Sequence, residues 1–413
     1  MNSMNWEVSN IIYFMEEKME IKNTMGKNLK SAKVGLEKNL QNAKIGLEKN
    51  IQNAKVGLEK NIQNAKVGLG NAKHTYKDIK ESLESAKEVF DKSYSEKSKK
   101  RELPSTNKTY GTFPSSDGKT TIDYMCISPS EPPKMIFQFF HGMAEYKERY
   151  TELGEYLAQA GIAFFIADHL GHGKSIISDE HLGYFGKPEG WKYMVYDGKA
   201  LTDIAKRIYP DIPFVIGGHS MGSFVTRAYL SFYPNIADKA VIVGTGNGNV
   251  LTSMGKLLAK IIGAFKGSMH RSQFLNTMAF APYNKKIENP ITPFDWLSLN
   301  EENVRTYMGD PLCGFTFTAN GFENLTGLLG DITKKSTIKN YNRNTEILLL
   351  AGKEDPVGSY TEHVVAFEKT LKDMGVKNVT TKLYDNLRHE ILNEECKQEI
   401  FSELLEWLEI PKR

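Results

Sequence analysis

Beyond residue 108, short apolar runs of strand length alternate with longer amphipathic segments. Most of the apolar runs are four to six residues long and rich in Ile, Val, Leu and Phe, which is typical of strands buried on both faces. The segments between them repeat apolar residues at helical spacing. The predicted strands are Met135–Phe140, Ile162–Ala167, Pro213–Gly218, Ala240–Val243, Ile347–Ala351 and Thr380–Tyr384, and the predicted helices include Met194–Ile208, Ser223–Leu230, Glu362–Met374 and Cys396–Leu408.

This alternation predicts an α/β fold with a parallel sheet, because parallel strands need a crossover helix between them. A hairpin, Thr109–Phe113 with Thr120–Ser128, precedes the alternating part. From residue 249 to about 341 the alternation stops, and helical and aromatic stretches take its place. We interpret residues 249–341 as a mostly helical cap, inserted after the strand Ala240–Val243 in a domain that covers residues 109–413.

A different pattern fills the N-terminal region, residues 1–92, where an eleven-residue unit recurs as Leu29–Asn39, Leu40–Asn50 and Ile51–Asn61 and then degenerates. Eleven residues nearly complete three helical turns, so Leu or Ile and Ala of each unit form one narrow stripe beside lysines. Three interpretations stay open: a solvated, helical or disordered arm, an amphipathic helix on an anionic membrane, and a self-associating coiled coil. Residues 93–108, rich in Ser, Lys and Glu, are predicted to be a linker.

The composition limits the classes of binding partner and the cellular compartment that we expect for this protein. The 413 residues carry a net charge of only +3, so no overall field indicates nucleic acid, although residues 21–80 hold thirteen Lys against four acidic residues. The three cysteines (Cys126, Cys313, Cys396) are few and scattered, which favours a reducing compartment. No apolar run approaches the ~20 residues of a membrane span, and the N-terminus lacks a signal-peptide pattern. We expect a cytoplasmic protein, free or peripheral on a membrane.

The candidate chemistry starts at Gly218-His-Ser220-Met-Gly222, a Gly-x-Ser-x-Gly motif between a predicted strand and a predicted helix. A strand that turns this tightly into a helix holds its central residue at positive φ and needs glycine on both sides. The turn exposes the hydroxyl of Ser220 above the helix N-terminus. Strand before and helix after are the context of a nucleophile elbow, so we predict that Ser220 is a nucleophile.

A serine nucleophile needs a base, and the base needs an acid that fixes its tautomer. Asp355 lies just beyond the buried strand Ile347–Ala351, and His389 lies beyond the last strand. The chain order Ser220, Asp355, His389 is the order of nucleophile-elbow enzymes. Glu354 and Asp385 remain alternative acids, and Asp355 could instead be a helix N-cap.

Two backbone N–H groups are predicted to bind the oxyanion of the reaction: that of Met221, after the nucleophile, and that of Met143, in the loop after the strand Met135–Phe140. In that loop, Gly142 allows the turn and His141 is expected to brace it. His169 and His172 match no metal-binding spacing, so we predict no metal. No phosphate-binding glycine motif follows a strand, so no nucleotide or other cofactor is expected.

Together, His141–Glu145, Asp168–Ser175, Gly218–Gly222, Asp355 and His389 resemble an α/β-hydrolase. More narrowly they are similar to the monoacylglycerol lipase and lysophospholipase branch, the serine aminopeptidase-like (S33) hydrolases. The cap stretches Phe294–Leu297 and Asp310–Phe315 are similar to bacterial members. The resemblance covers about residues 108–413 and implies an α/β-hydrolase sheet with an inserted cap. The repetitive arm lies outside the family pattern.

These observations predict a serine hydrolase that cleaves a carboxylic ester through an acyl-enzyme. The resemblance implies a monoacylglycerol or lysophospholipid substrate. Alternatives are a short-chain carboxylesterase or thioesterase, and a non-catalytic hydrolase fold that binds ligands and carries a membrane-associating arm. The predicted partners are an acyl-ester substrate and an anionic lipid surface for the arm.

Overall fold

The computed structural model describes residues 105–409. The predicted arm, residues 1–92, and the predicted linker up to residue 104 lie outside the described residues. The first strand, β1 (Thr106–Pro114), includes the last three residues of the segment 93–108, which the sequence indicated as linker. Its alternation of apolar and polar residues is weak at this end, because most of the strand is exposed at the edge of the sheet.

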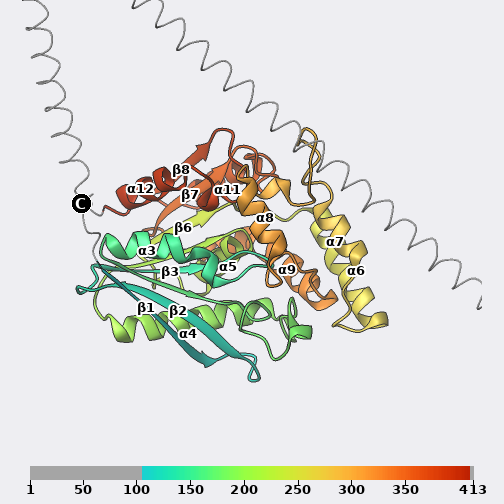
Figure 1. Cartoon of the computed structure of the whole chain (residues 1–413), viewed down its shortest axis with the longest axis horizontal. Coiled ribbons are helices and arrows are strands. Elements are labelled where there is room, and N and C mark those ends of the chain that lie inside the picture. The colour runs from blue at the N-terminus through green and yellow to red at the C-terminus, as the bar shows by residue number, and fades with distance from the viewer. Residues whose placement is uncertain (1–104, 410–413) are drawn as a thin grey trace, which may run out of the picture. The chain divides into compact units, whose positions relative to one another are not determined.

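Eight strands form one sheet in the order β1-β2-β4-β3-β5-β6-β7-β8 (Figure 1). β1 and β2 form the predicted hairpin, β2 pairs antiparallel with β4, and all other neighbours are parallel. The predicted α/β fold is therefore confirmed. The remaining strands are β2 (Thr121–Pro129), β3 (Met135–Phe140), β4 (Ile162–Ala167), β5 (Phe214–His219), β6 (Lys239–Val243), β7 (Glu346–Gly352) and β8 (Val379–Tyr384).

Helices cover both faces of the sheet because each central strand is apolar on both faces. In β3, Phe137 and Phe139 join the core cluster that contains residues of α3 and α12, whereas Ile136 and Phe140 join the cluster that contains residues of α4, α5 and α11. Successive side chains of a strand point to opposite faces, so a continuous apolar run supplies both cores. The helices are α3 (Thr151–Gln159), α4 (Trp191–Ile208), α5 (Met221–Phe232), α11 (Glu362–Asp373) and α12 (Lys397–Trp407).

The cap follows β6, as predicted, and occupies one end of the molecule (yellow and orange in Figure 1). It contains the 3₁₀ turn η3 (Asp295–Leu297) and the helices α6 (Val250–Lys266), α7 (Gln273–Phe280), α8 (Glu301–Gly309), α9 (Ala319–Ile332) and α10 (Lys335–Lys339). A capping box between Asn249 and Thr252 starts α6, and Gly267 at φ 91° ends it. Within residues 105–409, no helix is both long and apolar enough to cross a bilayer.

The loops that follow the parallel strands lie at the carboxyl edge of the sheet, where α/β proteins build their sites. His141 follows β3, Ser220 follows β5, Asp355 follows β7 and His389 follows β8. A buried ion pair fixes part of this edge: Nζ of Lys147 lies 2.7 Å from Oδ2 of Asp168 and 2.5 Å from Oδ1 of Asp123. This edge therefore collects every side chain that the sequence selected for chemistry.

Candidate active site

The elbow is built as the Gly-x-Ser-x-Gly motif predicts. Ser220 joins β5 to α5 with φ 54° and ψ −121°, a conformation that only the surrounding contacts can hold. A Cβ on Gly218 would lie 2.3 Å from the carbonyl O of Gly222, and one on Gly222 would lie 2.1 Å from the carbonyl O of Phe140. Neither position accepts a side chain, so the two glycines are what allows the turn to pack against β3.

Asp355 and His389 come together, although 34 positions separate them. Nδ1 of His389 lies 2.9 Å from Oδ2 of Asp355, and the other carboxylate oxygen accepts the N–H of Val357 at 2.8 Å. Because the carboxylate can only accept, Nδ1 carries a proton, and in the neutral ring the lone pair is then on Nε2. Nε2 is buried and makes no hydrogen bond to any described residue, Ser220 included.

The imidazole of His389 nevertheless lies beside the elbow. Its ring centroid is 4.6 Å from that of His219, the residue before Ser220. The N–H of Ser220 donates to Val243 at 3.0 Å, and a Cβ on the next residue, Gly244, would be 3.1 Å from Cε1 of His389. The alternative acids are placed elsewhere: Glu354 is exposed, and Asp385 is an exposed partner of Lys353.

The loop after β3 lies against the serine. A Cβ on Gly142 would approach Cβ of Ser220 to 3.2 Å. The N–H groups of Met143 and Met221 donate no hydrogen bond to any described residue, although Met221 is buried. A buried N–H group normally has a partner, so the free N–H of Met221, together with that of the half-buried Met143, is suited to an incoming anion.

His141 braces this loop. Its Nε2 accepts the N–H of His169 at 2.9 Å, so its proton is on Nδ1, which donates to the carbonyl O of Gly142 at 2.8 Å. Burial lowers the pKa of His141 to about 3 and that of His172 to about 3. These histidines are therefore neutral structural residues, and no group of three or more acidic, His or Cys side chains in the described part of the chain is arranged to hold a metal ion.

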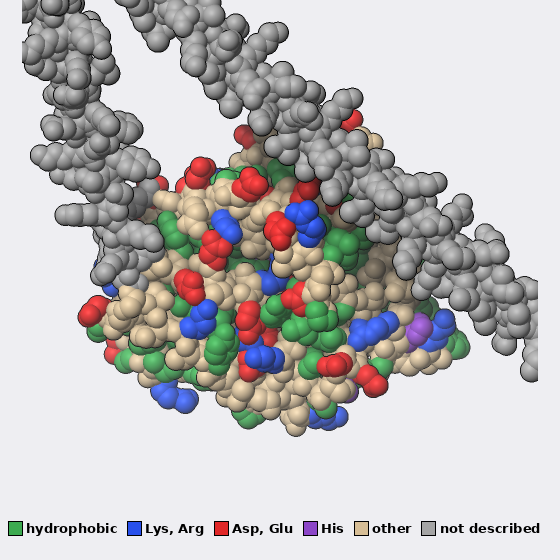
Figure 2. All heavy atoms as spheres, in the orientation of Figure 1, with side chains coloured by type: hydrophobic (Ala, Val, Ile, Leu, Met, Phe, Trp, Pro, Cys, Tyr) green, Lys and Arg blue, Asp and Glu red, His purple; other side chains and the backbone are tan. Residues whose placement is uncertain are grey.

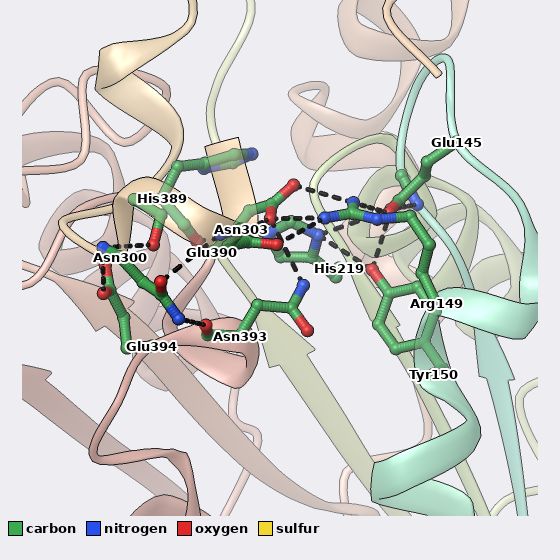
Figure 3. A network of polar contacts seen from close by, with 12 residues as sticks. Glu145, Arg149, Tyr150, His219, Asn300, Asn303, His389, Glu390, Asn393 and Glu394 are labelled. Carbon is green, nitrogen blue, oxygen red and sulfur yellow. Dashed lines mark hydrogen bonds and ion pairs between the residues drawn. The ribbon is translucent and has the colours of Figure 1, made fainter. Parts of the chain in front are cut away.

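Figure 3 shows a buried charge network beside the elbow, formed by Glu145, Arg149, Tyr150, His219, Asn303 and Glu390. Arg149 binds Glu390 with both terminal nitrogens, at 2.9 and 2.7 Å, and also pairs with Glu145. Sequence reasoning did not assign these residues. Only their positions in the sequence could have indicated a role in the site. Glu145 is two residues after Met143, in the loop that follows β3, and Glu390 directly follows His389.

The cap closes the site on the side of His389. The ring of Trp296 lies 5.2 Å from that of His389, and the aromatic side chains of Phe280 and Tyr283 pack on Trp296. Nε1 of Trp296 is buried without a hydrogen-bond partner among the described residues. A pocket of about 250 Å³ opens nearby. It includes neither Ser220, Asp355 nor His389, and is lined by Tyr283, Lys286, Ile287, Glu288, Leu299, Glu354, Tyr360, Asn386 and Arg388.

Comparison with known proteins relates the chain to a family of hydrolases. Residues 131–396 match the model of a hydrolase family described as serine aminopeptidase, S33. A monoacylglycerol lipase of Mycolicibacterium smegmatis is 25% identical over 299 residues, which are 70% of this chain and 94% of the relative. A monoglyceride lipase homologue of Monkeypox virus is 24% identical over 68% of this chain and 91% of its own length. The solved structure of a thermostable carboxyl esterase from Bacillus coagulans aligns with a TM-score of 0.69 and 26% identity, over 73% of this chain and 98% of its own.

Proposed function

The chain belongs to the serine aminopeptidase (S33) family of α/β-hydrolases and is an ester-hydrolysing enzyme, and from this premise we propose that Ser220, His389 and Asp355 are its catalytic residues. The contact between His389 and Asp355 carries the proposal. It fixes the imidazole in the tautomer whose free nitrogen, Nε2, can accept a proton, in a buried place beside a strained serine.

In the proposed reaction, Oγ of Ser220 attacks the ester carbonyl carbon and gives its proton to Nε2 of His389. The N–H groups of Met143 and Met221 stabilise the negative oxygen that forms, and each such donor contributes about 10²–10³ in rate. His389 then gives this proton to the oxygen of the departing alcohol, and the acyl group stays bound to Ser220 as an acyl-enzyme. Water, deprotonated by the same nitrogen, releases the carboxylic acid and restores Ser220. Residues 141–143 and the elbow glycines keep these groups in place.

For the substrate, we propose a single-chain lipid ester, a monoacylglycerol or a lysophospholipid. The names of the relatives support this class. The aromatic cap side chains next to His389 also favour an apolar acyl chain, and the free N–H of Trp296 is a donor that a polar head could use. A short-chain carboxylesterase or thioesterase remains the competing function, and a purely ligand-binding role would leave the oriented pair His389 and Asp355 without a purpose.

We also propose that the enzyme works at an anionic membrane surface, in the cytoplasm, with the arm as one contact. The cap supplies a second supporting observation: α6 exposes four apolar side chains at helical spacing, namely Met254, Leu257, Ile261 and Phe265, the last 87% exposed. Residues 250–287 contain six Lys or Arg and no Asp or Glu. Figure 2 shows basic and hydrophobic side chains together at this end of the domain. An apolar face flanked by lysines is typical of helices that lie on anionic lipid.

The test is Ser220→Ala, assayed on a panel of monoacylglycerols, lysophospholipids and short soluble esters of graded chain length. We expect turnover of every ester to fall by about 10⁶, as when a serine nucleophile is removed from a protease. The wild type should prefer one head group and long chains if it is a lipid esterase. Turnover by the alanine variant would refute the nucleophile, and a preference for acyl chains shorter than about six carbons would favour the competing function.

A further inference from the structure

His219 stands between the nucleophile and the buried charge network, and its hydrogen bonds determine its protonation state. Nε2 lies 3.1 Å from the carbonyl O of His389, which can only accept, so Nε2 carries a proton. Nδ1 lies 3.0 Å from the hydroxyl of Tyr150. That hydroxyl donates its single proton to Oε1 of Glu145 at 2.7 Å, so toward Nδ1 it must accept. Both ring nitrogens therefore donate, and the ring is an imidazolium.

The charges around His219 require the same cation. Burial alone would raise the pKa values of Glu145 and Glu390, but Arg149 between them lowers both, so both are ionised. One arginine cannot neutralise two buried carboxylates, and an uncompensated buried charge is strongly destabilising. The cation of His219, whose Nδ1 lies 3.7 Å from Oε1 of Glu145, balances the network.

Comparison with His141, His169 and His172 shows that burial is not what protonates His219. Burial would lower the pKa of His219 as well, but the carboxylate of Glu145 outweighs it and raises the pKa above its usual value. In contrast, His141, His169 and His172 have lowered pKa values because burial and their mutual repulsion dominate. Of these four buried histidines, His219 is therefore held as a cation and the other three as neutral rings.

We propose that His219 is a positioning residue that acts as a positively charged link between three parts of the site. It precedes Ser220 in the chain, holds the backbone of His389 through Nε2, and holds the loop after β3 through Tyr150 and Glu145 (Figure 3). Nucleophile, base and oxyanion loop are thereby tied to one ring. The inference rests on the proposed function, because it assumes that Ser220 and His389 react.

The link has a defined pH dependence. The titratable and charged groups that face His219 are Glu145, Arg149 and Tyr150 on the β3 side and His389 and Glu390 on the β8 side. Because the pKa is raised, the cation is present below that pKa and is lost as the pH rises through it. Its loss breaks one of the two hydrogen bonds and leaves a carboxylate unbalanced. We expect kcat to fall on the alkaline side with the slope of a single proton, while KM changes little.

The decisive measurement is ¹H–¹⁵N NMR of the full chain labelled with ¹⁵N-histidine at pH 7. We expect one ring with two protonated nitrogens that is absent from His219→Gln, whereas the rings of the neutral cluster each show one unprotonated nitrogen. If His219→Gln does not fold, Tyr150→Phe, which keeps the ring volume, should lower the titration midpoint of this one signal. An unprotonated nitrogen on His219 at pH 7 would overturn the proposal.

Kinetics distinguish a positioning role from a structural one. His219→Gln should lower kcat by about 10- to 100-fold, the cost of a small misplacement of reacting groups, keep KM, and lose the alkaline fall of kcat. His181→Gln, in a partly exposed histidine that contacts Ser178, is the matched control and should change nothing. An unchanged kcat in His219→Gln would refute the role. Ser220→Ala should keep the histidine signal, so a failed nucleophile and a failed link give different results.

Discussion

The substitution Asp355→Asn tests how the acid orients the base. Asp355 is fully buried and uses both oxygens, one to accept Nδ1–H of His389 and one to accept the N–H of Val357. An asparagine has one oxygen and one NH₂ group for these two donors. If its oxygen faces His389, the NH₂ group meets the N–H of Val357, and a buried donor is left unpaired at a cost of about 1–3 kcal/mol.

The opposite orientation is therefore favoured. The oxygen of the substituted side chain then accepts from Val357, and its NH₂ group donates to Nδ1 of His389, which moves the imidazole proton to Nε2. A protonated Nε2 cannot accept the proton of Ser220. The same tautomer change in a serine protease lowers kcat by about 10⁴, and at ~1.36 kcal/mol per factor of ten this is about 5.4 kcal/mol of transition-state stabilisation.

The assay is kcat on a soluble chromogenic ester, with circular dichroism to confirm folding. Asp385→Asn is the matched control, because Asp385 is one of the two alternative acids that the sequence left open and pairs with Lys353 at the surface. We expect Asp385→Asn to stay within about twofold of the wild type, since exposed ion pairs contribute little. A folded Asp355→Asn enzyme with more than a tenth of the wild-type kcat would refute the tautomer argument.

Two further predictions concern stability and the lipid surface. Lys147→Met should lower the free energy of unfolding, measured in urea, by about 3–5 kcal/mol, because it leaves Asp123 and Asp168 without their cation. The control is Lys108→Met, in a half-exposed ion pair with Glu155, which should lower the free energy of unfolding by less than about 1 kcal/mol. Equal losses in the two variants would contradict the burial argument. Replacing Leu257 and Phe265 by Ser should weaken cosedimentation with phosphatidylglycerol vesicles at least tenfold, at about 1.5 kcal/mol per side chain. Val365→Ser on α11 is the control, and unchanged partition of the cap variant would mean that α6 does not touch lipid.

Local patterns were sufficient to predict the sheet and to select candidate site residues in the loops after its strands. The Gly-x-Ser-x-Gly motif between a strand and a helix selected Ser220, and position after an apolar strand together with chain order selected Asp355 and His389. The pairing of His389 with Asp355 then agreed with chain order. These features depend on residues within a few positions of each other, which is the range that sequence patterns describe.

Burial of charge could not be predicted in this way. Arg149 lies in a polar stretch that resembles an exposed helix start, and its partner Glu390 is 241 positions away. Whether such a side chain is solvated or enclosed depends on the three-dimensional neighbours, and no local pattern contains them. The same applies to His219, whose place beside the motif serine in the sequence does not indicate its buried contacts.

The attachment of the loop that carries His389 to the cap restricts how a substrate can enter the proposed site. Arg388 donates to the carbonyl groups of Asp295 and Ser298, and the N–H of Glu390 donates to the carbonyl O of Leu297 at 2.7 Å. These hydrogen bonds are made by the residues before and after His389. A displacement of residues 295–298 would therefore move the imidazole of His389 away from its position beside Ser220. The entrance for an acyl chain must therefore be formed by other cap elements. Redesign of chain-length selectivity should begin in α6 and α7 and leave residues 295–298 unchanged.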